Sequence, residues 1–85
     1  MLSKTKVKNA ESRGAPIFSF NYKGKRRNVQ INTQAVRDQS RCWGTPISNS
    51  VVRHNGHLYL TAIDHNDNRE VKRFRMDKIT KVEGI

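Results

Sequence analysis

Residues 51–60 read Val-Val-Arg-His-Asn-Gly-His-Leu-Tyr-Leu, and this stretch decides the fold. Asn55-Gly56 is the strongest two-residue signal for a tight turn between antiparallel strands, because both residues tolerate positive φ. Apolar side chains stand before the turn at 51–52 and after it at 58–60. The stretch therefore predicts a β-hairpin over residues 50–64.

The flanking segments predict further short strands. Residues 18–22 alternate three aromatic side chains with two polar ones, which is the period of a half-buried strand. A turn at 23–25 leads into a second strand at 26–31. Residues 70–78 alternate again, with Phe74 and Met76 on the inner side, and 79–85 predict a short closing strand.

These patterns predict an all-β domain over residues 16–85. It is a small SH3/Sm-like barrel or a strongly bent antiparallel sheet of five to six strands. At most one short helix is expected, from Asn32 or Thr33 to about Gln39, and 40–49 reads as a loop. Residues 1–15 are polar and basic without apolar periodicity, which predicts a flexible basic arm. Such an arm is either a tail without a role or a segment that orders on a phosphate backbone.

The balance of charge indicates an anionic partner. Seventeen Lys and Arg stand against seven Asp and Glu, for a net charge of +10. Nucleic acid is the partner that such a balance most often serves, and a generally cationic surface is the alternative. Basic residues concentrate in 1–27 and 69–81, which would form one patch if the first and last strands pair.

Two further features concern location. The single cysteine, Cys42, excludes an internal disulfide and indicates a reducing compartment. The chain has no apolar run long enough to span a bilayer and no secretory signal pattern at its N-terminus. We therefore expect a cytoplasmic protein with no membrane partner.

Nine side chains are candidates for contact with nucleic acid. Lysines follow a phosphate backbone as point charges, whereas arginines pair bidentately with phosphate and stack on bases. The sequence offers no long recognition helix for a major groove, and small basic β-barrels with aromatic faces suit single-stranded or irregular RNA. The candidates are Lys23, Lys25, Arg26, Arg27, Trp43, Tyr59, Arg73, Arg75 and Lys78.

The aromatic residues divide into core and surface candidates. Three phenylalanines at 18, 20 and 74 lie at inward positions and are expected in the core. Tyr22 lies beside the basic turn, so core packing and base stacking stay open for it, as they do for Tyr59. Trp43, in the predicted loop, is either a stacking residue or a plug over one mouth of the barrel.

No pattern of catalytic chemistry is present, so we expect no enzyme activity and no cofactor. His54 and His57 flank the hairpin turn and His65 follows the next strand, but a structural zinc site needs four ligands, commonly thiolates. Cys42 is the one thiol available. These histidines are expected at hairpin ends, where one of them can touch RNA, and no metal site is expected.

The last third of the chain resembles the WYL domain, an Sm-like or SH3-like β-barrel module. The resemblance is carried by residues 57–62, His-Leu-Tyr-Leu-Thr-Ala, and 73–79, Arg-Phe-Arg-Met-Asp-Lys-Ile. Tyr59 and Arg75 match the family pattern, whereas Leu58 stands in place of its Trp and Lys78 in place of its second Arg. The resemblance implies a module that binds nucleic acid or a nucleotide ligand, with Tyr59 and Arg75 at the pocket.

In size and charge the chain is also similar to small phage-encoded RNA-binding antagonists of type III toxin–antitoxin endoribonucleases. That similarity implies a bacteriophage toxin inhibitor, or antitoxin, in the host cytoplasm, with a ribonuclease toxin as protein partner. The alternative is a protein-interaction or ligand-sensing module that binds a nucleotide or small anion. A remaining strand edge makes a homodimer a further expectation.

Overall fold

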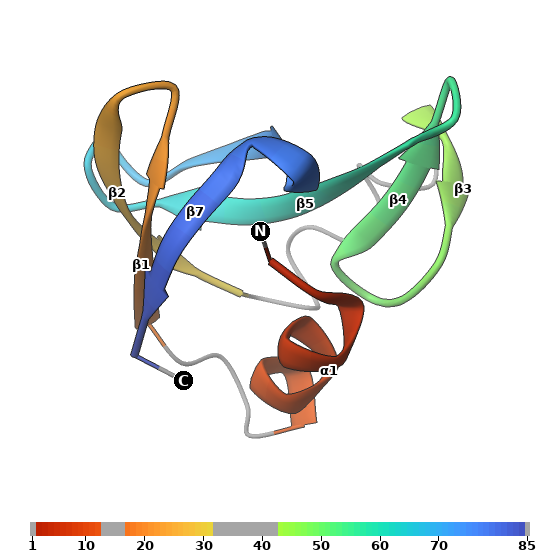
Figure 1. Ribbon diagram of the computed structural model, residues 1–85, viewed down its shortest axis with the longest axis horizontal. Helices are drawn as coiled ribbons and strands as arrows, with labels where there is room; N and C mark the ends of the chain where they lie inside the picture. Colours follow the sequence, from red (N-terminus) through yellow and green to blue (C-terminus); the bar gives the residue numbers. More distant parts are fainter. Residues whose placement is uncertain (1, 13–16, 32–42, 85) are drawn as a thin grey trace.

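The computed structural model describes residues 2–12, 17–31 and 43–84, which form one antiparallel sheet with a short helix packed on it (Figure 1). The elements are α1 (Lys4–Ser12), β1 (Ile17–Tyr22), β2 (Lys25–Gln30), β3 (Thr45–Pro46), β4 (Val51–His54), β5 (His57–Asp64), β6 (Glu70–Arg75), the 3₁₀ helix η1 (Met76–Lys78) and β7 (Ile79–Glu83).

The strand order explains the strong bend of the sheet. Strands follow one another as β3-β4-β5-β2-β1-β7, and β6 pairs with β5. Strand β5 hydrogen-bonds to three others, to β4 near its start, to β2 near its end and to β6 along most of its length. The chain passes from β6 through η1 into β7, which pairs with β1, so the first and last strands lie side by side (Figure 1).

This architecture confirms the predicted all-β class with a strongly bent antiparallel sheet and one short helix. The sheet has seven strands rather than five to six, because the two-residue β3 pairs with β4 inside the stretch predicted as a loop. The first and last strands pair, which is the condition under which the two basic segments were expected to approach each other. The helix predicted from Asn32 or Thr33 to Gln39 lies outside the described residues, as does Cys42.

Both predicted hairpins are present, and their turns have the same geometry. Lys23 and Gly24 have φ of 51° and 80°, and Asn55 and Gly56 have the same two values. Positive φ at both central residues is the type I′ pattern, whose twist matches that of the flanking strands. Each two-residue turn fixes the register of its hairpin, Tyr22 opposite Lys25 and His54 opposite His57.

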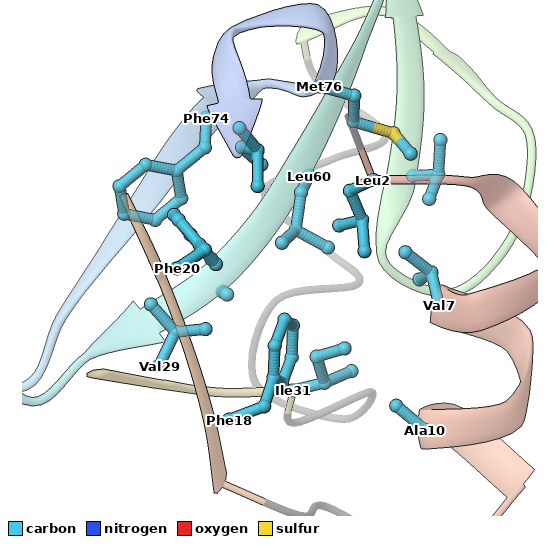
Figure 2. Close-up of a cluster of buried hydrophobic side chains, with 13 residues drawn as sticks. Leu2, Val7, Ala10, Phe18, Phe20, Val29, Ile31, Leu60, Phe74 and Met76 are labelled. Atoms are coloured by element: carbon cyan, nitrogen blue, oxygen red, sulfur yellow. The ribbon is translucent and has the colours of Figure 1, made fainter. Parts of the chain in front are cut away.

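The core fills the concave side of the bent sheet (Figure 2). Phe18, Phe20 and Phe74 are buried, as predicted. The rings of Phe20 and Phe74 meet edge to face at 5.2 Å, and those of Phe18 and Phe20 lie 5.8 Å apart. Edge-to-face contacts add to the free energy gained by burying the rings.

Residues Lys4–Ser12 form a helix that packs on the core, within the segment 1–15 for which the sequence predicted a flexible arm. Leu2, Val7 and Ala10 are buried, and Figure 2 shows them on the side of the cluster opposite Val29 and Phe74. The helix begins after Ser3, whose Oγ accepts a hydrogen bond from the amide of Lys6 at 3.2 Å. This side-chain cap satisfies one free amide at the helix start.

A carboxylate fixes the other end of α1 to the sheet. Oε1 of Glu11 accepts hydrogen bonds from Oγ of Ser48 at 3.0 Å and from the amide of Ser50 at 2.9 Å. The helix is therefore held by two apolar side chains, Val7 and Ala10, and by one carboxylate, although its overall composition is polar. Among the described residues, no helix is long and apolar enough to cross a membrane.

The packing of α1 predicts that Val7→Ala destabilises the protein by about 2 kcal/mol, because the Val7 side chain is fully buried. Urea unfolding measures this change. Thr5→Ala on the exposed face is the matched control and is expected to change stability by less than about 0.5 kcal/mol. Equal stability of the two variants would mean that α1 does not dock.

Candidate nucleic-acid interface

Three rings gather on the face of the sheet opposite the core. The ring of His54 stacks on that of Trp43, with 3.9 Å between centroids and 15° between planes. The ring of Tyr59 meets Trp43 edge-on at 4.7 Å. A ring nitrogen of His54, Nδ1, lies 3.0 Å from the carbonyl oxygen of Trp43. Trp43 is therefore held in one orientation by its neighbours.

The β4–β5 hairpin positions these rings. Val52 pairs with Tyr59, and because side chains alternate along a strand, Val52, His54 and Tyr59 share one face. The segment that carries Trp43 lies close against β4, since a Cβ on Gly44 would come within 2.5 Å of the carbonyl oxygen of Arg53. Only glycine allows this approach.

Two arginines of β6 border the rings. Arg73 pairs with Thr61 and Arg75 with Tyr59, which brings both to the same face. The Cζ atom of Arg73 lies over the Trp43 ring at 4.6 Å, a cation–π contact. These five residues, Trp43, His54, Tyr59, Arg73 and Arg75, are called the aromatic–arginine cluster below. The structure thus brings together four residues predicted separately for nucleic-acid contact.

A carboxylate holds Arg75. Its Nε lies 2.8 Å from Oδ1 of Asp77, and its backbone amide donates to the hydroxyl of Tyr22 at 3.2 Å. The Tyr22 ring packs edge-on against Phe74 at 5.0 Å. Tyr22 thus joins β1 to the end of β6, and of the two roles left open for it the structure supports packing.

Arg26 is bound within the sheet. Its Nη1 donates to Oδ1 of Asn21 at 3.1 Å and to the carbonyl oxygen of Lys81 at 2.7 Å. Its Nη2 donates to Oγ of Ser19 at 2.9 Å and lies 3.0 Å from Oε2 of Glu83. The guanidinium therefore joins β1, β2 and β7, although the sequence suggested a phosphate contact.

Arg27 points toward a buried carboxylate. Asp64 is fully buried, with Nη1 of Arg27 at 3.4 Å and Nζ of Lys72 at 3.2 Å from its Oδ2. Its other oxygen accepts a hydrogen bond from the amide of Asn66 at 2.9 Å. Nζ of Lys72 also donates to Oδ2 of Asp67 at 2.6 Å. This ionic cluster closes the end of the core between β2, β5 and β6.

The remaining basic candidates lie at the turn of the β1–β2 hairpin and on η1. Lys23, Lys25 and Lys78 are exposed, and Nζ of Lys23 lies 5.4 Å from the centroid of the Tyr22 ring. Tyr22, which precedes Lys23, pairs with Ile79, which follows Lys78. These lysines extend the positive surface beyond the aromatic–arginine cluster.

Sequence reasoning missed two features of this region. His54 was expected only at a hairpin end, although the Asn55-Gly56 turn already implies that His54 shares a face with Tyr59. Asp64 was not singled out, and burial of a carboxylate has no local sequence signal. Within residues 2–12, 17–31 and 43–84, no three His, Cys, Asp or Glu side chains are grouped for a metal ion.

Comparison with protein-family models, curated proteins and solved structures finds no match to this chain. The resemblance to WYL domains therefore depends on residues 57–62 and 73–79 alone and stays a prediction.

The ionic cluster predicts a stability that falls at both extremes of pH. The hydrogen bond from Lys72, and then its charge, lower the pKa of Asp67 below 3.8, so this contribution is present above pH 3.8 and is lost on acidification. The hydrogen bond to Asp67, with a smaller effect of Asp64, raises the pKa of Lys72 above 10.5. That contribution is present below pH 10.5 and is lost as pH rises.

Urea unfolding across the pH range measures both losses. Lys72→Met should reduce the loss of stability at both extremes of pH. Lys8→Met on α1 removes the same charge elsewhere and should leave the dependence of stability on pH as in the wild type. The same dependence of stability on pH in all three proteins would contradict the role given to the contact between Lys72 and Asp67.

Proposed function

We propose that this chain binds single-stranded or irregular RNA through the aromatic–arginine cluster. The observation that carries the proposal is the guanidinium of Arg73 over the Trp43 ring at 4.6 Å, beside Tyr59, on a chain of net charge +10. Arginine planes and aromatic rings are the surfaces on which proteins stack unpaired bases.

The arrangement suits a base that stacks on Arg73. His54 already covers part of Trp43, so an incoming base would stack on the outer side of the Arg73 guanidinium or displace it from the ring. The rings hold one another before RNA arrives, which lowers the entropy cost of binding. The edge of a guanidinium can also pair with a phosphate while its face stacks.

Exposed lysines supply the phosphate contacts in this proposal. Lys23, Lys25 and Lys78 are free of the sheet interior and stand at the β1–β2 tip and η1. Arg26 and Arg27 instead serve the sheet and the ionic cluster. The expected RNA surface is thus smaller than the nine residues predicted from sequence.

A small-anion pocket at Tyr59 and Arg75 is less well supported. The carboxylate of Asp77 already lies at Nε of Arg75, and an anion would have to displace it. An exposed pair of this kind costs little to open, so a polyanion held by many contacts can recruit Arg75 more easily than a single anion can. Inhibition of a ribonuclease toxin stays a prediction that requires RNA binding first.

Arg73→Lys tests the proposal, because lysine keeps the charge and loses the stacking plane. We expect about tenfold weaker binding to fluorescent single-stranded RNA, since stacking of one base contributes about 1–3 kcal/mol. A salt series should give a slope of about −0.7 per phosphate contacted. Arg69→Lys, in the β5–β6 turn, is the matched control.

Three results would count against the proposal. They are equal RNA affinity for Arg73→Lys and wild type, tighter binding to duplex DNA than to RNA, and weak salt-independent binding to both. In the last case binding of a free nucleotide that depends on Arg75 would favour the ligand-sensing alternative.

A further inference from the structure

A groove runs along α1 and the residues just before it. Three hollows follow one another there, with volumes of about 360, 210 and 480 Å³. The first and second share Lys4, and the second and third share Lys8. Ile47 and Ser48 form the opposite wall of the middle hollow.

The middle hollow is positively charged, because Lys4 and Lys8 line it and no carboxylate does. Lys4 and Lys8 are exposed and stand one helical turn apart, about 6 Å between their Cβ atoms. At one end Glu11 accepts hydrogen bonds from Ser48 and Ser50, and at the other Asp77 pairs with Arg75. Both lysines thus bring their positive charge to the middle hollow.

The first hollow has a different character. Leu2, Leu58 and Met76 form apolar walls, and His57 stands at the rim. Asp77 lines this hollow, while its partner Arg75 pairs across the sheet with Tyr59. The Arg75–Asp77 pair therefore connects the cluster to the groove.

The packing of α1 fixes the lysines in place. Val7 and Ala10 bury the opposite side of the helix, and Glu11 ties its last turn to the segment before β4. A lysine on a mobile arm loses conformational entropy over the whole arm when it binds. Lysines on a docked helix lose only side-chain freedom.

We infer that the α1 groove is a second part of the RNA site, which takes the strand as it leaves the aromatic–arginine cluster. The phosphates lie along Lys4 and Lys8, and one base enters the apolar hollow at Leu58. The inference rests on the proposed function, since the groove is reached by RNA already held at the cluster. Charge complementarity selects a polyanion as occupant.

The test compares two lengths of single-stranded RNA, about 4 and about 16 nucleotides, within the range of site sizes for small basic barrels. The double variant Lys4→Gln/Lys8→Gln should reduce the salt slope on the long RNA by about 1.4, from about 0.7 for each of two phosphates. It should leave binding of the short RNA nearly unchanged, because the short strand occupies the cluster alone.

The matched control is Arg69→Gln/Lys81→Gln, which removes the same charge from exposed positions outside the groove. Arg69 lies in the turn at the opposite end of β5 from the β4–β5 turn, which borders the first hollow. Thermal unfolding of both variants checks that the substitutions leave the fold intact, which is expected because all four positions are exposed.

The outcomes separate the two proposals. A smaller slope for the groove variant on long RNA only, beyond that of the control, supports the groove. Equal slopes for the groove variant and the control, with wild-type RNA binding intact, overturn the groove and leave the proposed function standing. Failure of the wild type to bind either RNA overturns both.

Discussion

The alternation of side chains along β5 is the constraint on which the rest of the structure depends. Leu60 and Ala62 point into the core, while Tyr59 lies on the opposite face with Trp43 and His54. A slip of one residue in the pairing would exchange the two faces and place Tyr59 in the core. The same register thus sets the hydrophobic core and the candidate RNA surface together.

Two devices hold that register, one at each end of β5. At the start, the type I′ turn of Asn55 and Gly56 fixes β5 against β4. At the end, Asp64 is buried between Arg27 of β2 and Lys72 of β6. Removal of one partner from a buried ion pair leaves an uncompensated charge, which is far more costly than loss of a surface pair.

The ion pairs also shape the surface of this basic protein. Those formed between described residues involve Arg26, Arg27, Lys72 and Arg75, of which the first three join strands of the sheet. These acidic side chains thus mainly pair with basic residues that join strands of the sheet. The lysines of α1, of the β1–β2 turn and of η1 stay on the surface, and this division motivates a polyanion as partner.

Local signals made much of the sheet predictable. Asn55-Gly56 and Lys23-Gly24 carry turn chemistry in two adjacent residues, and the aromatic alternation at 18–22 has the strand period. Helix α1 was missed because only Val7 and Ala10 give it an apolar face, and its stability comes from contacts with the core.

The site was predictable only in part. Tyr59, Arg73 and Arg75 follow from strand alternation, and so does their common face. The contact of Trp43 with His54 and Arg73 depends on how a segment outside the hairpin folds back on β4, which sequence spacing does not encode. Burial of Asp64 and the four contacts of Arg26 join residues far apart in the chain, so no local pattern reports them.

Fluorescence of Trp43 during titration with single-stranded RNA tests the central claim most directly, because it is the single tryptophan of the chain. The account predicts saturable quenching at the RNA concentration that gives half-maximal binding, since a stacked base changes the surroundings of the ring. Binding of RNA, measured independently, that leaves the emission of Trp43 unchanged would contradict the account, because the aromatic–arginine cluster would then not be the RNA site.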